Sequence, residues 1–252
     1  MPARPLRFYL FSFFLLSNPS PASAQYSLIE AIQNSEQSLV GVHAENTTLA
    51  GPPQTQMALD GRTGKLVAVK HASAAHFERF GAGVVIDPSG LIVTNFHVIS
   101  YCTQVTVEFK NGTTVPARIV HLVPQYDFAL LQIQAPFPLA PVEFADSKAV
   151  KLGDNIANVG SSYWRKGTIS GGRIIGIGTG SSQKDPGDTD LLQLNINFYK
   201  GDSGGPLFDD HGRFVGLVVA KQTTIDRSGF AIPAHKIQAY TEEYLKSEKL
   251  QP

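Results

Sequence analysis

The sequence predicts an all-β protein, a sandwich or a barrel, that ends in one helix. From Gly81 onward, short apolar runs alternate with turn residues, and no long helical pattern separates them. The final segment, from Pro233 to about Leu250, instead carries its apolar residues at helical spacing. The 252 residues include 23 Gly and 16 Pro and are 42% hydrophobic, which is typical of a globular, turn-rich fold.

Residues 1–24 are predicted to be a cleaved secretory signal peptide. Arg4 and Arg7 precede the apolar run FYLFSFFLL, which is too short to span a bilayer as a permanent helix. Ala22 and Ala24 then supply the small residues that a signal peptidase accepts, which argues against the alternative of an uncleaved membrane anchor. We therefore expect a secreted or periplasmic protein that begins near Gln25 and does not stay inserted in a membrane.

Residues 25–80 are expected to hold a short helix, the first strand and a long loop. Ser27 and Glu30 fit a capping box that opens a helix running to about Glu36. The run SLVGVHAE then alternates like a strand. Residues 46–64 are rich in Gly, Pro and Thr and are interpreted as an exposed loop.

The remaining strands are predicted from apolar runs with turns between them. Turn signals at Pro88-Ser89-Gly90 and at Asn111-Gly112 join neighbouring strands as hairpins. A second polar loop is expected from Thr179 to Asp190. The predicted strands are GVVID, LIVTN, QVTVEF, TVPARIV, FALLQI, NIANV and part of GTISGGRIIGIGTG.

The C-terminal helix is predicted to dock on the β structure. Ile237, Tyr240, Tyr244 and Leu245 fall on one helical face, behind a proline suited to a first turn. A helix that binds a separate partner is the alternative, but a narrow apolar stripe is what ordinary docking needs.

Charge and cysteine content limit the possible functions. The formal net charge is zero, so the overall balance does not call for nucleic acid as a partner. Cys102 is the single cysteine and is expected to be a buried, inert thiol. No His/Cys group has metal-ligand spacing, so neither a metal nor another cofactor is expected.

The motif GDSGG, residues 201–205, marks Ser203 as a candidate nucleophile. It satisfies the G-x-S-x-G pattern of the α/β-hydrolase nucleophile elbow, and Asp226 and His235 follow in the right order. An elbow needs a helix directly after the serine, whereas GGPLFDDHGRFVGLVV contains Pro206, a turn and a β pattern. The interpretation as a nucleophile elbow is therefore rejected. That Ser203 is a hydroxyl without a catalytic role in a glycine-rich turn is still an alternative at this point.

Upstream residues offer a second set of partners for Ser203. His97 follows the apolar strand LIVTN, where a side chain can face a cleft. Asp127 precedes the apolar strand FALLQI, where a carboxylate can be partly buried and still reach an imidazole. Spacing alone does not choose His97 over the six other histidines.

Five segments together resemble the HtrA/DegP-like branch of the trypsin-like serine proteases. They are GAGVVIDPSGLIVTNFHVI, YDFALLQI, LGDNIANVGSSYWRKGTISGGRIIGIG, LLQLNINFYKGDSGGPLF and SGFAIP, in the family's order and at about its intervals. The match covers roughly residues 38–237. The resemblance implies two six-stranded antiparallel β-barrels with the active site between them. Residues 81–150 would complete the first barrel, 151–233 would form the second, and 234–252 would be the helix and tail.

The resemblance also implies the roles of individual residues. His97, Asp127 and Ser203 match the catalytic triad, and the backbone N–H groups of Gly201 and Ser203 match the oxyanion hole. By position, Asn197 lies at the base of the substrate pocket, with Val219, Ala220, Lys221 and Gly229 among its walls. A neutral Asn197 favours small or medium apolar side chains before the scissile bond.

Asp202 departs from the HtrA-like pattern, which usually has Asn before the nucleophile. In the digestive trypsin-like enzymes, an aspartate here pairs with a new N-terminal amine, and no matching activation site is visible in this sequence. Burying an unpaired carboxylate would cost several kcal/mol. Internal pairing with a basic residue is expected, and an exposed Asp202 without a role is the alternative. The candidate partners are Lys200, Arg165, Lys166 and Arg173.

The expected activity is that of an exported serine endopeptidase acting on polypeptides, unfolded ones among them. The alternative is a catalytically silent protein of the same fold that binds peptides. The family often carries PDZ domains after the protease, and none is expected here because only the helix fits. Monomer and homotrimer both stay open as assembly states.

Overall fold

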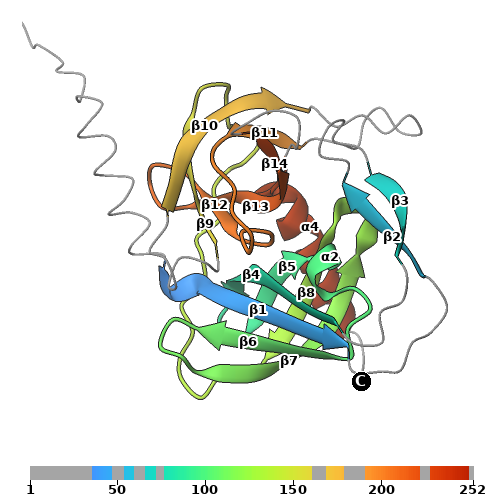
Figure 1. The fold of residues 1–252 in the computed structure, drawn as a ribbon. Helices are drawn as coiled ribbons and strands as arrows, with labels where there is room; N and C mark the ends of the chain where they lie inside the picture. Colours follow the sequence, from blue (N-terminus) through green and yellow to red (C-terminus); the bar gives the residue numbers. More distant parts are fainter. Residues whose placement is uncertain are drawn as a thin grey trace, which may run out of the picture.

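The protein forms two closed β-barrels in a computed structural model (Figure 1). All strand pairs within the barrels are antiparallel, as the sequence pattern with its tight turns requires. The predicted fold class, two six-stranded barrels and a C-terminal helix, is confirmed. The structure describes residues 36–46, 54–59, 66–71, 77–160, 169–178, 191–221 and 228–249.

The first barrel follows a 3₁₀ turn, η1 (Glu36–Ser38), and closes in the order β1-β4-β5-β8-β7-β6. Alternate side chains of these strands fill its interior, so that β-branched residues such as Val40, Val42 and Val107 are buried there. The strands are β1 (Leu39–Asn46), β4 (Phe77–Asp87), β5 (Leu91–Asn95), β6 (Gln104–Phe109), β7 (Thr114–Val123) and β8 (Phe128–Ile133).

The second barrel closes in the order β10-β11-β14-β13-β12-β9. Its interior is lined by buried residues that include Ile156, Leu194 and Leu207. The predicted boundary near residue 150 falls in the segment between the barrels. The strands are β9 (Asn155–Val159), β10 (Ile169–Ile177), β11 (Leu192–Asn195), β12 (Pro206–Phe208), β13 (Phe214–Lys221) and β14 (Gly229–Pro233).

A separate hairpin corrects part of the sequence reading. Residues 46–64 were interpreted as a loop, but β2 (Gln54–Leu59) pairs with β3 (Leu66–His71) in a two-stranded antiparallel sheet. Six residue pairs, from Gln54↔His71 to Leu59↔Leu66, form this ladder. Thr is common in strands and strand propensity depends strongly on context, so the polar character of the segment does not exclude a strand. The hairpin lies beside the first barrel (Figure 1).

A shared hydrophobic core joins the two barrels. Phe128 and Val84 of the first barrel and Phe208 and Phe214 of the second belong to one cluster and are fully buried. The connecting segment adds backbone hydrogen bonds to both sides. Its Val142 N–H donates to the Val85 carbonyl at 3.0 Å, and further along the Phe214 N–H donates to Glu143 at 2.7 Å. The placement of one barrel against the other is therefore set by packed side chains and backbone hydrogen bonds.

Helix α4 (Ala234–Lys249) packs along both barrels (Figure 1). Ile237 is fully buried in the shared core, and Tyr244 is 8% exposed. Tyr240 makes edge contacts with the rings of Phe128 and Tyr126 in the first barrel, at centroid distances of 5.6 Å each. The predicted docking face, including Leu245, is confirmed.

Several predictions fall outside the described residues. They are the signal peptide, the helix from Ser27 as far as residue 35, and the loop from Thr179 to Asp190. Within the described ranges, no helix is long and apolar enough to cross a membrane.

We expect Ile237→Ala to destabilise the protein by about 2–5 kcal/mol, because the side chain is fully buried in the core shared by both barrels. Urea unfolding followed by tryptophan fluorescence measures the change. Glu243→Ala, on the exposed side of the same helix, is the matched control and should change stability by less than about 0.5 kcal/mol. Equal losses for the two variants would contradict the docking described above.

Candidate active site

His97 is presented by a short helical turn at the end of a buried strand. The strand β5 is buried throughout, and it runs directly into α2 (Phe96–Ile99). Val98 and Ile99 enter the core of the first barrel. Because neighbouring residues of one turn point in different directions, the His97 side chain faces outward and is 30% exposed. The apolar pattern of FHVI thus decides which way the imidazole points.

Asp127 holds both the ring and the backbone of His97. It follows the 3₁₀ turn η2 (Pro124–Tyr126) and adopts a left-handed conformation, with φ 56°, which Asp tolerates better than most residues. Its Oδ2 lies 2.7 Å from His97 Nδ1, and its Oδ1 accepts the His97 backbone N–H at 2.9 Å. The side chain is almost completely buried.

The carboxylate decides the tautomer of His97. An ionised Asp127 is an acceptor only, so the neutral imidazole carries its proton on Nδ1 toward Oδ2. Nε2 is then left with a lone pair. The Asp127 carbonyl adds two more contacts, accepting the Phe96 N–H at 3.1 Å and the Asn95 amide at 3.0 Å. The whole turn is therefore tied to Asp127.

Ser203 comes from the second barrel and is held against the first. The Ala82 N–H donates to the Ser203 carbonyl at 2.8 Å, and the Gly204 N–H donates to Val218 at 3.0 Å. At Gly204 a β-carbon would lie 2.2 Å from the Ala82 carbonyl oxygen and 3.1 Å from the Asn95 nitrogen. The serine loop thus packs directly on the strand that leads to His97.

His97, Asp127 and Ser203 are in this way gathered at the junction of the barrels. Among the described residues, no hydrogen bond joins the His97 ring to the Ser203 side chain. Such a bond is often long before substrate binds.

The residues before Ser203 form a tight turn. The Asp202 N–H donates to the Tyr199 carbonyl at 3.1 Å, and Gly201 has φ 101°. A positive φ at this third position is typical of a type II turn and disfavours residues with a β-carbon. Among the described residues, the Ser203 N–H donates to no acceptor.

The predicted pocket residues lie on neighbouring strands of the second barrel. Gly229 opens β14, where it pairs with Leu194 of β11 and Lys221 of β13. Asn197, just beyond β11, is exposed. Val219 is buried at the bulge of β13, and Ala220 and Lys221 complete that strand. That these residues form a substrate pocket stays a prediction.

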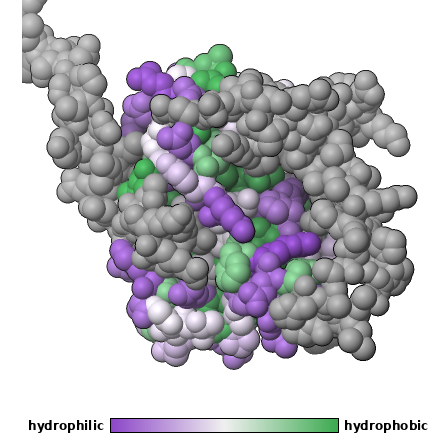
Figure 2. Space-filling view, in the orientation of Figure 1, coloured by the Kyte–Doolittle hydropathy of each residue, from purple (hydrophilic) through white to green (hydrophobic). Residues whose placement is uncertain are grey.

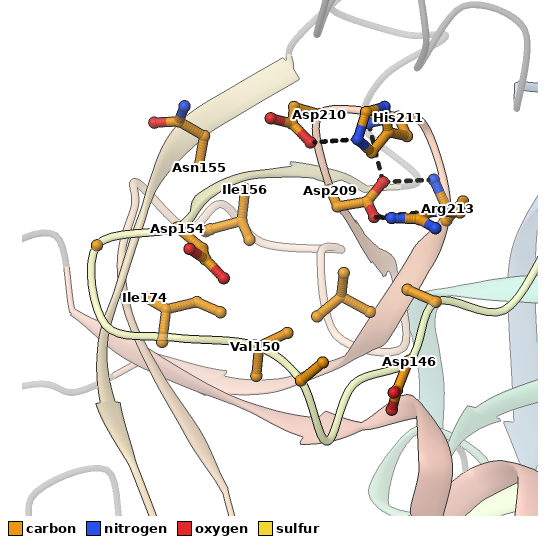
Figure 3. A pocket seen from close by; sticks show the side chains of 14 residues that line it. Asp146, Val150, Asp154, Asn155, Ile156, Ile174, Asp209, Asp210, His211 and Arg213 are labelled. Carbon is orange, nitrogen blue, oxygen red and sulfur yellow. Dashed lines mark hydrogen bonds and ion pairs between the residues drawn. The ribbon is translucent and has the colours of Figure 1, made fainter.

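A pocket of about 490 Å³ lies elsewhere on the second barrel (Figure 3). Val150, Ile156 and Ile174 lie at its base, and several aspartates lie around it. Asp209 is paired with Arg213, at 2.8 Å. None of the three candidate catalytic residues lines this pocket, and the described residues hold no group of His, Cys, Asp or Glu suited to a metal.

A family model described as a trypsin-like peptidase domain matches residues 81–217. This match covers more than half of the chain. The chain belongs to the trypsin-like peptidase family. The matched segment contains His97, Asp127 and Ser203.

Individual relatives place the chain in the HtrA/DegP-like branch of the trypsin-like peptidases. It is 30% identical over 178 residues to a probable periplasmic serine endoprotease DegP-like of Rickettsia conorii, covering 68% of this chain and 34% of the relative. It is 29% identical over 174 residues to the periplasmic serine endoprotease DegP of Escherichia coli K12, covering 68% and 36%. It is 33% identical over 165 residues to the serine protease HTRA1B of Danio rerio, covering 65% and 34%. The chain thus spans about a third of the length of these relatives.

A solved structure supports the trypsin-like fold independently. The crystal structure of the serine endoprotease from Yersinia pestis matches with a TM-score of 0.65 and 24% identity, over 87% of this chain and 66% of that one. At 24% identity, this likeness shows the fold alone.

Asp202, the residue that departs from the HtrA-like pattern, is 3% exposed. The alternative of an exposed Asp202 is therefore wrong. Its Oδ2 accepts the Tyr199 N–H at 2.8 Å. Within the described residues, it forms no ion pair with Lys200 or Arg173, and the other two candidates, Arg165 and Lys166, lie outside those residues. Pairing with one of the latter two stays a prediction.

Sequence reasoning missed two further residues that contact the candidate site: Asn95 donates to the Asp127 carbonyl, and Arg79 donates to the His97 carbonyl. The sequence pattern marks Asn95 only as the end of the strand LIVTN and places Arg79 only within residues 25–80. A charged side chain two positions before the glycines and valines of β4 is the available signal for Arg79. Cys102 is half-buried rather than buried, and burial raises the pKa of its thiol, which agrees with an inert role.

We expect Gly160→Ala to lower stability by about 2–3 kcal/mol, because a β-carbon there would lie 1.8 Å from Asp202 Oδ1 and 2.9 Å from the Asp202 Cα. Urea unfolding measures the effect. Gly171→Ala in β10 is the matched control, since nothing lies within 4 Å of its added β-carbon. If both variants unfold at the wild-type urea concentration, the close packing of Gly160 on Asp202 is wrong.

Proposed function

We propose that the chain is an exported serine endopeptidase that hydrolyses peptide bonds with His97, Asp127 and Ser203. The observation that carries this proposal is the Asp127–His97 pair, 2.7 Å between Oδ2 and Nδ1, placed beside a serine loop of the other barrel. Membership of the trypsin-like peptidases supports it. The relatives named periplasmic endoproteases support an exported location.

The chemistry follows from the free lone pair on His97 Nε2. As substrate binds, Nε2 accepts the proton of the Ser203 hydroxyl while its oxygen attacks the peptide carbonyl. Asp127 keeps the imidazole in the required tautomer and stabilises its positive form. His97 then returns the proton to the leaving amine, and a water molecule releases the acyl group by the reverse sequence.

The oxyanion of the tetrahedral intermediate is stabilised by backbone N–H groups of Gly201 and Ser203. The positive φ of Gly201 supports this role, because it orients the peptide of the turn in a way that a side chain would hinder. Each such donor typically stabilises the transition state by about 3–4 kcal/mol.

Polypeptides are the substrates, and unfolded chains are the ones that a cleft between two barrels admits most easily. Exposed aromatic surface next to the site supports an apolar ligand, since Tyr199 is 46% and Tyr101 37% exposed. Hydrophobic residues also reach the surface in the middle of the face drawn in Figure 2. The side chain before the scissile bond enters a pocket made by Asn197, Val219, Ala220, Lys221 and Gly229.

A fluorophosphonate probe tests for the activated serine. We expect it to label the folded wild type and to label neither Ser203→Ala nor His97→Ala, because the hydroxyl is nucleophilic only beside a base. Ser89→Ala and His121→Ala are matched controls, since Ser89 is exposed in the turn after β4 and His121 packs against Tyr244 of α4, and both changes should leave labelling unchanged. Folded wild type that stays unlabelled and cleaves no protein would instead support a peptide-binding protein.

Cleavage of unfolded casein tests the pocket. Because Asn197 is neutral, mass spectrometry of the products should show cleavage after small or medium apolar residues. Asn197→Asp should shift cleavage toward Lys and Arg by adding a negative charge to the pocket. Dominant cleavage after Lys or Arg by the wild type would overturn the predicted preference.

A further inference from the structure

The guanidinium of Arg79 contacts the helical turn that carries His97. Arg79 lies on β4, and one of its terminal nitrogens, Nη1, donates to the His97 carbonyl at 2.8 Å. The same nitrogen lies 2.9 Å from the Ser100 carbonyl oxygen and 2.8 Å from the Ser100 hydroxyl. All three acceptors belong to the C-terminal end of α2, so a single cation holds that end.

The end of α2 needs such a partner, because the last carbonyls of a helix have no N–H donor within the helix. α2 is four residues long, and the Ser100 N–H closes it by donating to the Phe96 carbonyl at 2.8 Å. A turn this short has little stability of its own. A positive charge at a helix C-terminus is also electrostatically favourable.

α2 is therefore held from both ends by opposite charges. On the N-terminal side, the Asp127 carboxylate accepts the His97 N–H at 2.9 Å. On the C-terminal side, Arg79 donates to the His97 carbonyl. Both peptide groups that flank the His97 Cα are thus held by a charged side chain from another segment. Together they fix the direction of the His97 Cα–Cβ bond.

Arg79 is itself firmly placed. Its guanidinium carbon lies 4.5 Å from the centre of the Phe77 ring, within the range of a cation–π contact. Its strand is paired with β1 on one side, with Arg79 opposite Ala44. Burial lowers the pKa of Arg79, yet an arginine remains protonated in a protein, so all its N–H groups stay available as donors.

We propose that Arg79 is a positioning residue that fixes the direction of the His97 imidazole through the backbone of α2. The inference rests on the proposed role of His97 as the general base. Small displacements of a base cost rate, because proton transfer needs correct geometry at the moment of attack, and a misplacement of about 1 Å can cost about 100-fold.

The test compares Arg79→Met, which keeps the length and apolar stem, with Arg79→Lys, which keeps the charge but loses the planar fork. Fluorophosphonate titration first counts competent sites, and kcat and KM are then measured per titrated site on a short peptide substrate. We expect Arg79→Met to lower kcat at least about 10-fold with KM within about twofold, and Arg79→Lys to recover part of the loss.

Arg213→Met is the matched control, because it removes a guanidinium that is paired with Asp209 at 2.8 Å in the second barrel. Its kcat per titrated site should equal that of the wild type. A merely structural role for Arg79 would lower the number of titrated sites and leave kcat per site unchanged. That outcome for Arg79→Met would overturn the proposal.

A spectroscopic measurement separates this proposal from the proposed function. The Nδ1–H of His97 gives a downfield proton resonance when it is held against a carboxylate, and this signal requires no catalysis. If the wild type proves inactive, the function fails, while loss or broadening of the resonance in Arg79→Met still supports positioning. An unchanged resonance in both Arg79 variants would overturn the inference. If Arg79→Met does not fold, the kcat per titrated site and the His97 resonance of Arg79→Lys decide whether Arg79 positions His97.

Discussion

Ser203 and His97 belong to different barrels, so the distance between them depends on the contact that holds the serine loop against the first barrel. The hydrogen bond from the Ala82 N–H to the Ser203 carbonyl, 2.8 Å long, makes that contact at the serine itself. One such bond contributes only about 1 kcal/mol, so the shared core has to supply the rest of the attraction. A β-carbon at Gly81 would lie 2.9 Å from the same carbonyl oxygen, which shows how little space separates the two segments.

The first barrel adds a second constraint by immobilising one helical turn. The strand before α2 is buried, the turn itself sends two apolar side chains into the core, and charged groups hold its backbone. The imidazole is held at Nδ1 by Asp127 and faces outward, 30% exposed. Rigid support on strands places a catalytic group more accurately than a free loop does.

Local sequence patterns predicted β1 and β4 to β10, but not the β2–β3 hairpin or the pairing of residues at the site. Runs such as LIVTN and FALLQI, bounded by turn residues, predict strands because alternation and turn chemistry are local properties. The pairing of His97 with Asp127 joins positions 30 residues apart and could not be obtained from spacing, since the chain has six other histidines. The resemblance to a known family supplied it.

One incorrect expectation and one alternative that the sequence left open have physical causes. The strand β2 differs from the expected loop because its polar sequence, QTQMAL, forms a strand only through pairing with β3, which lies beyond the segment interpreted as a loop. The burial of Asp202 was uncertain because it depends on Gly160, which lies 42 positions earlier and leaves the space that the carboxylate fills. Neither relation is visible within a short window of sequence.

That Cys102 is the single cysteine of the sequence has a practical consequence for handling the protein. With one cysteine in 252 residues, no disulfide can link the barrels, and packing together with hydrogen bonds performs that task. Folding is therefore independent of the redox state of the compartment, and the chain should reach the same structure in a reducing cytosol as in an oxidising one. Reductants can be kept in every buffer used to purify and assay it.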